Sequence, residues 1–423
     1  MTALTRSAAD VVVVGGGPAG AATAWALARA GVDVLVCERA RFPRAKPCAE
    51  YLSPQASRLL AEMGALDAVE RAGGAELVGM RVRAPNGVTF EGRFAASHGF
   101  RGFRDRGFAL RRELLDAILL DCARAAGARV VEDARVASVL TDGAGRALGV
   151  RVHGRAGNGE GAGGATERDV AARFVVGADG LRSVVARRLA LARAARWPCR
   201  IAFVTHYRGV EGIGDCGEMH VSREGYCGLA DVGGGVTNVA LVVPHALAAG
   251  ARGDSTGFFE RRLAADPALA PRFARAGRVS PVRVTGPFAS HARRAWAPGA
   301  ALVGDAADFW DPFTGEGIYA ALRGGELLAP FLGEALRART PRDADRVLAA
   351  YDRRRRREFA GKWRVERLVA LAVAWPPLLN RVARAFRRRT HLADLFVGVT
   401  GDFVPPRELL RPCVLGQLLV SAR

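Results

Sequence analysis

Lysine is almost absent from this chain of 423 residues. Only Lys46 and Lys362 occur, so nearly all of the 62 basic residues are arginines, and the formal net charge is +20. A surplus of this size can indicate a nucleic-acid or membrane partner. The arginines are spread along the chain, however, and few aromatic residues are interleaved with them. We therefore expect no nucleic-acid partner.

Cysteines are few, and no two of them form a C-x-x-C pair. Seven scattered cysteines, an odd number, argue against both a disulfide framework and a zinc site. We expect reduced thiols and no metal site. The opening residues MTALTRSAAD contain no apolar stretch of the kind found in secretory signals, which favours a cytoplasmic location.

Long hydrophobic runs are also lacking. The best late one, residues 368–379 (LVALAVAWPPLL), is interrupted by two prolines and is shorter than the roughly 20 residues that cross a bilayer. An arginine-rich segment, residues 351–367, comes directly before it. Two interpretations stay open: peripheral docking on an anionic membrane surface, or a solvated helix that leads into a packed one.

What the chain does contain is a glycine-rich turn near its start. Residues 11–14 are four valines, Gly15, Gly17 and Gly20 follow as G-x-G-x-x-G, and a second apolar run ends at Glu38. This order predicts a strand, a tight turn, a helix and a second strand. A pyrophosphate then lies at the helix N-terminus, where free N–H groups favour anions, and the acid accepts hydrogen bonds from ribose hydroxyls. We predict a bound dinucleotide without a 2′-phosphate.

Two further motifs place an acid and a glycine after an apolar strand. Residues 175–180 (VVGADG) deliver Asp179 and Gly180, and residues 302–305 (LVGD) deliver Gly304 and Asp305. The second is followed by the loop 311–318 (DPFTGEGI) and a helix that starts near Ile318. Alone, each motif is an ordinary turn. An acid here can hold sugar-alcohol hydroxyls, and backbone N–H groups at the helix start can stabilise a negative ring edge.

Together the three motifs resemble flavoproteins of the aromatic-hydroxylase (p-hydroxybenzoate hydroxylase) fold. The stretch 42–54 (FPRAKPCAEYLSP) is most similar to the geranylgeranyl reductase and halogenase branch, which tends to have K-x-C-G followed by LSP; here Ala49 replaces the glycine. The resemblance covers about residues 11–335. It implies bound FAD, with NAD(P)H as a transient reductant, since no second G-x-G-x-x-G unit follows a strand.

The resemblance also implies which residues bind FAD. An arginine at the position of Arg112, in RRELLD, contacts the FAD phosphates or ribityl chain in such proteins. Arg44 lies in a segment that runs past the flavin in this family. The full set of expected cofactor-binding residues is Gly15, Gly17, Pro18, Ala19, Gly20, Glu38, Arg39, Arg44, Arg112, Val136, Asp179, Gly180, Gly304, Asp305, Pro312, Gly315, Gly317 and Ile318.

The predicted fold is α/β (α+β): a discontinuous Rossmann-type FAD-binding domain, an inserted antiparallel β-sheet domain and a helical C-terminal region. Alternating residues around Asn86-Gly87 predict a hairpin, and the Gly-rich segment 153–168 is interpreted as a mobile hairpin loop without chemistry. We expect the FAD-binding domain at 8–74, 105–190 and 285–340, the substrate-binding sheet domain at 75–104 and 191–284, and the helical region at 341–423.

Several chemistries stay open. Oxygenation of a hydrophobic polyketide- or isoprenoid-type molecule is the first expectation, and C=C reduction of the geranylgeranyl reductase kind is the alternative, although the aromatic-x-Trp-x-Phe-Pro motif of such reductases is missing after Tyr226. Halogenation is disfavoured because no G-W-x-W-x-I-P stretch occurs. A non-enzymatic alternative is a protein that binds a flavin or a prenyl chain and catalyses no reaction. Catalytic candidates are Cys48, Asp308 and Tyr226, and further expected pocket groups are His206, Tyr207, His220 and Asn238.

Overall fold

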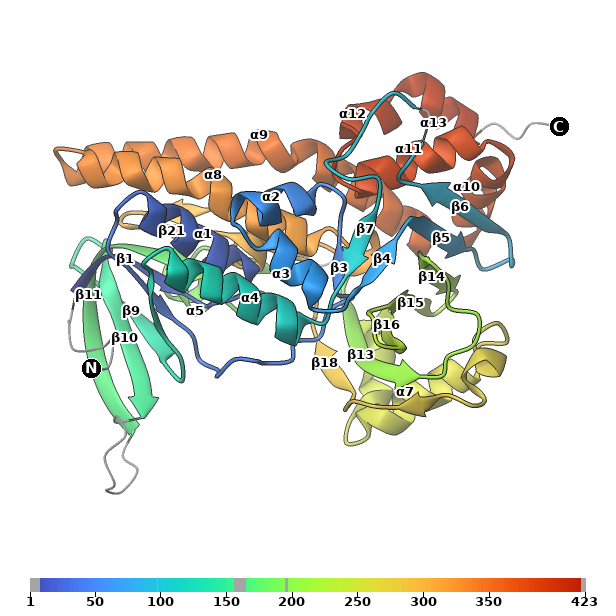
Figure 1. Ribbon diagram of the computed structural model, residues 1–423. Coiled ribbons are helices and arrows are strands. Elements are labelled where there is room, and N and C mark those ends of the chain that lie inside the picture. Colours follow the sequence, from blue (N-terminus) through green and yellow to red (C-terminus); the bar gives the residue numbers. More distant parts are fainter. Residues whose placement is uncertain (1–7, 97, 156–164, 195–196, 420–423) are drawn as a thin grey trace.

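The first strand, β1 (Ala8–Val14), lies in the middle of a mostly parallel sheet. This is seen in a computed structural model that describes residues 8–96, 98–155, 165–194 and 197–419 (Figure 1). The strand order is β20-β21-β11-β1-β2-β8, and β9 and β10 extend the sheet from β11. The other bounds are β2 (Val34–Cys37), β8 (Arg129–Val131), β9 (Arg135–Thr141), β10 (Ala147–Arg155), β11 (Ala165–Gly177), β20 (Trp296–Ala297) and β21 (Ala300–Leu302).

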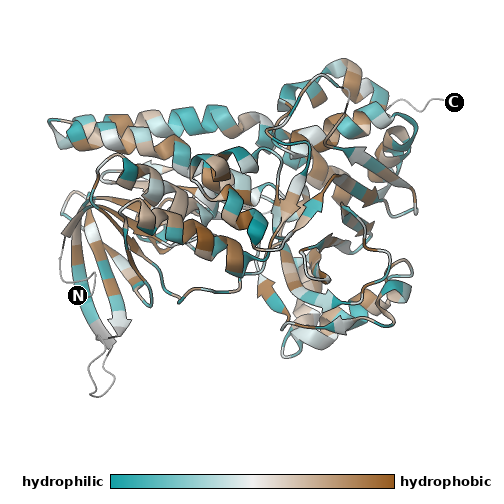
Figure 2. Ribbon diagram, in the orientation of Figure 1, coloured by the Kyte–Doolittle hydropathy of each residue, from teal (hydrophilic) through white to brown (hydrophobic). Residues whose placement is uncertain are grey.

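Helices cover this sheet and bury its central strands. The contacting helices are α1 (Pro18–Arg29), α4 (Arg112–Ala125), α5 (Val184–Arg188) and α8 (Gly317–Arg337). Val11, Val12 and Val13 have no exposed surface, as expected for a parallel strand that is covered on both faces. In Figure 2 the strands of this sheet are predominantly brown, so the hydrophobic run at the start of the chain forms the centre of the core. The predicted discontinuous Rossmann-type domain is confirmed.

A second large sheet is mostly antiparallel and has the order β17-β13-β16-β15-β14-β5-β6, with β18 paired to β13. Only the β14–β5 pairing is parallel. The bounds are β5 (Gly79–Arg83), β6 (Thr89–Arg93), β13 (Arg200–Arg208), β14 (Cys216–Ser222), β15 (Gly225–Asp231), β16 (Val236–Pro244), β17 (Gly277–Arg278) and β18 (Arg283–Thr285). The hairpin predicted at Asn86-Gly87 is β5–β6, and Gly87 has the positive φ of +82° that its turn requires.

The two faces of this second sheet have different neighbours. Along β13, Ala202 and Val204 face the core shared with the C-terminal helices, whereas Phe203 and Tyr207 face α7 (Ser255–Ala264). This alternation follows from the period of two residues along a strand. Figure 1 shows α7 on the outer side of the sheet, away from the first domain.

Two small sheets connect these large units. One has the order β3-β7-β4 and the other β12-β19-β22. β4 lies inside the segment 75–104 that was assigned to the substrate domain, yet it pairs with β7 and not with the large antiparallel sheet. The expected domain boundaries themselves stay a prediction. The strands are β3 (Tyr51–Leu52), β4 (Ala75–Leu77), β7 (Gly107–Ala109), β12 (Ala192–Ala194), β19 (Ser290–Ala292) and β22 (Asp308–Phe309), and the short helices are α2 (Ala56–Glu62), α3 (Leu66–Arg71), α6 (His245–Ala248), η1 (Ala249–Ala251), η2 (Ala270–Phe273), η3 (Gly304–Ala306) and η4 (Pro312–Thr314).

The C-terminal region is helical, as predicted. α9 (Pro341–Ala374) starts alongside α8, and its later part packs with the second sheet (Figure 1). It ends before Pro376, which begins α10 (Pro376–Arg388); α11 (Thr390–Thr400), α12 (Pro406–Leu409) and α13 (Pro412–Leu419) follow. Among the residues that the structure describes, no helix combines the length and the apolarity that a bilayer crossing needs.

The segment 153–168 belongs to a hairpin, as expected, but its ends are strand and not loop. Its ends belong to strands β10 and β11, which pair as a long hairpin in which His153 lies opposite Glu167. Cross-strand pairing overrides the weak strand preference of glycine there. Only the centre of the expected loop, residues 156–164, lies outside the described residues.

Candidate flavin site and adjoining cavity

The glycine turn between β1 and α1 is too tight for other side chains. A Cβ on Gly20 would lie 1.9 Å from the carbonyl oxygen of Gly15, and Gly15 itself has φ of +100°. The first turn of α1 contains no acidic residue, and Gly17 at its N-cap offers no side-chain cap within the described chain. The N–H groups at this helix end are therefore open to an anion.

Two guanidinium groups stand beside this helix end. A Cβ on Gly17 would be 3.6 Å from Nη2 of Arg44 and 4.0 Å from Nη2 of Arg112. Both arginines are held by one buried carboxylate, Asp116, which accepts hydrogen bonds from Arg112 Nε at 2.7 Å and Nη2 at 2.8 Å and pairs with Arg44 Nη1 at 3.0 Å. Arg44 Nε also lies 3.7 Å from Glu38 Oε1, so two carboxylates face the two arginines. The guanidinium N–H groups beside Gly17 are suited to bind a diphosphate.

Glu38 is buried at the end of β2, where its carboxylate accepts hydrogen bonds from the backbone N–H groups of Gly16, at 2.7 Å, and Ala40, at 3.0 Å. It therefore lies against the glycine turn, in reach of a ribose held there. Arg39, the next residue, is exposed, and Val136 is buried on β9.

The second motif places a carboxyl with an unused acceptor near the same turn. Asp179 Oδ2 accepts a hydrogen bond from the N–H of Val184 at 2.6 Å, whereas its buried Oδ1 has no hydrogen-bond partner among the described residues. Burial raises the pKa of this carboxyl. A buried acceptor without a partner is costly, so the hydroxyl of a bound cofactor is a suitable donor for it.

The third motif meets the first. A Cβ on Gly304 would lie 2.9 Å from Cβ of Ala19 on α1, so the strand end at Gly304 packs on the start of that helix. Next to it, burial raises the pKa of Asp305 and lowers the pKa of Lys46, and the two groups lie close enough to stabilise each other's charges. Gly315 ends the loop with φ of +73°, close to the ring of Tyr51.

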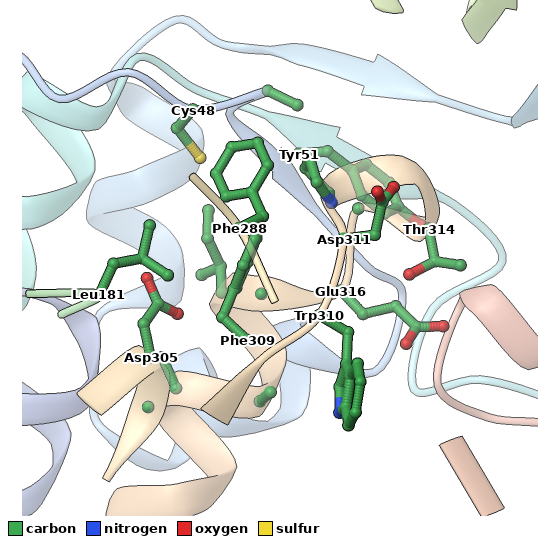
Figure 3. A pocket seen from close by; sticks show the side chains of 18 of the residues that line it. Cys48, Tyr51, Leu181, Phe288, Asp305, Phe309, Trp310, Asp311, Thr314 and Glu316 are labelled. Carbon is green, nitrogen blue, oxygen red and sulfur yellow. The ribbon is translucent and has the colours of Figure 1, made fainter. Parts of the chain in front are cut away.

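One cavity joins the three motifs (Figure 3). Of the expected cofactor-binding residues, those in its wall are Gly17, Pro18, Ala19, Arg112, Gly180, Gly304, Asp305, Pro312, Gly315, Gly317 and Ile318. Outside that wall lie Gly15, Gly20, Glu38, Arg39, Arg44, Val136 and Asp179. The glycine cradle, the paired arginines and the unused oxygen of Asp179 fit FAD, whose pyrophosphate, ribose and ribityl groups need these partners.

Beyond the motifs, part of the cavity is apolar and runs along the inner face of the second sheet, while Arg355, Lys362 and Glu366 of α9 line another part. Small residues of neighbouring strands, among them Ala202, Gly228 and Ala240, leave room there. Phe288 and Phe309, whose ring centroids are 5.2 Å apart, form part of the opposite wall. Figure 3 shows Cys48, Phe288 and Asp305 projecting from different elements around this space.

Of the four further polar groups expected in the pocket, none is in the cavity wall. Tyr207 packs on the outer face of the sheet, against Phe259 and Phe273. His220 also lies on that face, where it hydrogen-bonds Glu218 at 2.7 Å. Strand periodicity turns both side chains away from the cavity. His206 and Asn238 point inward, but they are engaged with Glu50.

Glu50 is a site residue that sequence reasoning missed. It is buried, has φ of +62°, and lies in the cavity wall directly after Ala49. Its carboxylate oxygens accept hydrogen bonds from the N–H of Arg112 at 2.8 Å, Asn238 Nδ2 at 3.0 Å and His206 Nε2 at 2.8 Å. The strained backbone is held in place by these bonds, which join the loop to the second sheet.

The three catalytic candidates, Cys48, Asp308 and Tyr226, all line the cavity. Cys48 Sγ accepts a hydrogen bond from the N–H of Glu50 at 3.3 Å. Asp308 is bound by Arg355 and by Trp363 Nε1, both on α9. Tyr226 donates its hydroxyl to Asp311 at 2.7 Å. Asp308 and Tyr226 are thus held by neighbours, and only the Cys48 thiol keeps its proton free to donate.

A buried acidic cluster on α9 and its neighbours was also missed. Lys362 Nζ binds Glu316 at 2.9 Å and Asp402 at 2.8 Å. Glu366, one turn further along α9, lies in the cavity wall, where burial raises its pKa to about 8 despite the nearby Lys362. Glu316 belongs to the loop 311–318 of the third motif, but Lys362, Glu366 and Asp402 come from other segments of the sequence and carry no local motif that could have revealed them.

Comparison with known proteins agrees with this site. Residues 8–214 match the model of an FAD binding domain. Digeranylgeranylglycerophospholipid reductase 2 of Methanopyrus kandleri is 32% identical over 335 residues, which are 77% of this chain and 77% of that protein. Menaquinone reductase of Mycobacterium tuberculosis is 29% identical over 424 residues, which cover 94% of this chain and 91% of that one.

Solved structures show the same architecture. A myxobacterial chondrochloren halogenase, described as a variant of FAD-dependent halogenases, superposes with a TM-score of 0.76 at 26% identity and covers 86% of this chain and 82% of its own. A geranylgeranyl bacteriochlorophyll reductase-like protein of Thermoplasma acidophilum shares the fold, with a TM-score of 0.71 at 22% identity and coverage of 97% and 96%.

The fold and the site define a flavoprotein oxidoreductase. The chain belongs to the family of FAD-dependent oxidoreductases that contains the digeranylgeranylglycerophospholipid reductases. The resemblance drawn from the three motifs is thereby confirmed, as is FAD as the cofactor.

Proposed function

We propose that this protein reduces C=C bonds of a long apolar substrate of the polyprenyl type, with NAD(P)H as the source of electrons. The observation that carries the proposal is the apolar slot beside the flavin site, walled by Ala202, Gly228 and Ala240 on one side and by Phe288 and Phe309 on the other. A hydrocarbon chain gains free energy in such a slot roughly in proportion to its buried area.

The relatives support reduction over oxygenation. The two relatives described above are named for the reduction of a digeranylgeranylglycerophospholipid and of menaquinone. Both names describe the reduction of a lipid. Oxygenation of the same substrate class, the first expectation from the sequence, is the alternative outcome of the experiment below.

The chain must supply a proton for this reaction. FAD, which the glycine turn with Arg44 and Arg112 would hold, would supply hydride chemistry to one alkene carbon, with NAD(P)H oxidised to NAD(P)⁺ as the consumed reductant. The other alkene carbon needs a proton from the cavity wall. We assign this role to two candidates in the wall: Cys48, a thiol beside Arg112, and Glu366, a carboxyl whose pKa is raised to about 8.

Arg112 has two roles in this proposal. Its guanidinium, fixed by Asp116, is near enough to stabilise the phosphates of FAD and also the thiolate left on Cys48 after proton transfer. The cavity itself excludes water through the apolar residues around it, which protects the reduced cofactor from side reactions.

The test is an accurate-mass analysis of products. The FAD-loaded protein is reduced anaerobically with NADH or NADPH and mixed with menaquinone or with a geranylgeranylated glycerophospholipid. A product whose prenyl chain has gained one or more pairs of hydrogen atoms supports the proposal. With menaquinone, the added hydrogen must remain after air has reoxidised the quinol head group, because reduction of the head alone also adds one pair. A product that has gained an oxygen atom, formed only when air is admitted, overturns it in favour of monooxygenation.

A further inference from the structure

Four large apolar side chains are exposed in one region of the surface, which we call the apolar ridge. They are Trp197, Leu368, Leu371 and Trp375, with exposed fractions of 45, 44, 46 and 56%. The last three are spaced by three and four residues on α9 and its end, so they lie along one side of the helix. Contiguous exposed apolar surface of this kind marks an interaction site.

The ridge borders a surface groove. Trp197, Leu368 and Leu371 line it together with Leu410, and its remaining walls are Trp310, Arg364 and Arg367. None of these lining residues is acidic. The groove therefore combines an apolar floor with a basic rim.

The basic rim carries charge that carboxylates do not neutralise. Arg364 lies four residues before Leu368 on the same side of α9, and Arg367 places its guanidinium 4.4 Å from the ring centroid of Trp310. Within the described ranges, neither arginine forms an ion pair with a carboxylate. One helical turn or more before them, Arg353 and Arg357 are exposed on the same helix, much of which is hydrophilic in Figure 2.

One side chain is shared by the groove and the cavity of the proposed reaction. Trp310 lines both. Its ring is stacked on His291, with centroids 5.3 Å apart, and its buried Nε1 lacks a hydrogen-bond partner among the described residues. Figure 3 shows Trp310 at the edge of the cavity, beyond Glu316 and Asp311.

We propose that the apolar ridge docks on an anionic lipid bilayer and holds the Trp310 wall of the cavity against the membrane. Tryptophan and leucine enter the boundary between headgroups and acyl chains, while arginines bind anionic headgroups. Docking itself is independent of the proposed function. Its use, the delivery of a lipid substrate, rests on that function.

Charge favours a membrane over a second copy of the chain. In a twofold contact the same surface meets itself, so the basic rims of two copies, each with a net charge of +20, would face each other. An anionic lipid surface instead complements this rim. The ridge also offers few groups that could hydrogen-bond a protein partner.

The first experiment measures co-sedimentation of the FAD-loaded protein with vesicles. We expect binding to vesicles of phosphatidylglycerol and phosphatidylcholine and little binding to phosphatidylcholine alone. In Arg364→Gln/Arg367→Gln, the loss of two charges at about 1 kcal/mol each predicts a roughly thirtyfold weaker affinity. Leu368→Ser/Leu371→Ser should lose binding to a similar degree.

Matched controls keep the test specific. Leu148→Ser removes an equally exposed leucine from β10, and Arg252→Gln/Arg275→Gln removes two exposed arginines near α7; both should bind vesicles as the unmodified protein does. Equal binding of all variants, or binding that ignores lipid charge, overturns the proposal. So does a dimer that Leu368→Ser/Leu371→Ser converts to a monomer in light scattering, because the ridge is then a contact between copies.

A second measurement tests the orientation. Lipids brominated in their acyl chains quench tryptophans that enter the bilayer, so part of the fluorescence should be quenched, and Trp197→Phe/Trp375→Phe should remove most of that quenching. Unchanged quenching in this variant overturns the orientation. If vesicle binding is lost in the ridge variants but no substrate is ever reduced, the docking stands and the proposed function fails.

Discussion

Glu366 gives a pH dependence that can be tested at the level of one residue. Its pKa is raised to about 8 by burial, so the carboxyl is protonated, and able to donate, at neutral pH. Turnover with a saturating lipid substrate should fall as pH rises through about 8. In Glu366→Gln this alkaline fall should vanish and the rate at neutral pH should drop about a hundredfold, the scale of general acid catalysis. Glu334→Gln, an exposed change on α8, is the control.

Cys48 is tested separately, because Cys48 and Glu366 are both candidates for the proton donor. Cys48→Ala should keep its FAD content and KM but lose about a hundredfold in kcat if the thiol is the proton donor. Cys122→Ala, at a half-buried cysteine on α4, should behave as the unmodified protein. A Cys48→Ala enzyme with full kcat would assign the thiol to packing alone and leave Glu366 as the donor.

His206 contributes to the junction between the loop at Glu50 and the second sheet. His206→Ala removes one of the hydrogen bonds to a buried carboxylate, at 2.8 Å, and should lower the free energy of unfolding by about 1–3 kcal/mol. Urea unfolding followed by flavin fluorescence measures this. Glu50→Gln keeps the shape of the side chain but weakens the charge-assisted hydrogen bonds. Its free energy of unfolding should fall less than that of the double variant His206→Ala/Asn238→Ala.

This junction also shows where sequence reasoning stops at the residue scale. Glycines and acids in short motifs can be recognised from the sequence, because the turn that requires them is formed by neighbouring residues. Glu50 meets His206 and Asn238, which are 156 and 188 positions away in the chain. Their individual side chains carry no pattern that links them, so only the folded chain brings them together.

At the scale of elements, the turn between β1 and α1 makes a sharp prediction. Gly20→Ala places a Cβ 1.9 Å from the carbonyl oxygen of Gly15, so the turn must open and FAD content should be lost. Gly31→Ala, just after α1, meets no atom within 4 Å, although its φ of +78° costs about 1 kcal/mol. That variant should keep its FAD and lose a few degrees in Tm. Equal FAD content in the two variants would contradict the role of the glycine turn in binding FAD.

The elements that the sequence predicted well are those with a complete local signal. The valine run before Gly15 and the Asn86-Gly87 hairpin were found in this way. β14 and β15 were not, because Gly217, Gly225 and Gly228 interrupt the strand pattern. A Cβ on Gly228 would lie 3.2 Å from Sδ of Met219. Gly228, which interrupts the strand pattern in the sequence, thus also leaves room in the apolar part of the cavity.

At the scale of the whole molecule, the charge of +20 predicts a strong effect of salt. Interactions between exposed charges are screened over about 10 Å at 0.1 M ionic strength and over about 3 Å at 1 M. Vesicle binding should therefore weaken steeply as sodium chloride is raised over this range, while FAD, held by buried groups such as Asp116 and Arg112, stays bound. Salt-insensitive vesicle binding would show that the apolar ridge binds the bilayer without a contribution from Arg364 and Arg367.

The scarcity of lysine has a practical consequence for chemical labelling. Both ε-amino groups of the chain, on Lys46 and Lys362, line the one cavity. Amine-reactive probes, which modify the many surface lysines of most proteins, can therefore reach lysine side chains of this chain only in this cavity. Burial lowers the pKa of Lys46, so its amine is more often uncharged and nucleophilic than an ordinary lysine. Acetylation of Lys46, followed by peptide mass spectrometry, thus becomes a footprint of whether the cavity is filled.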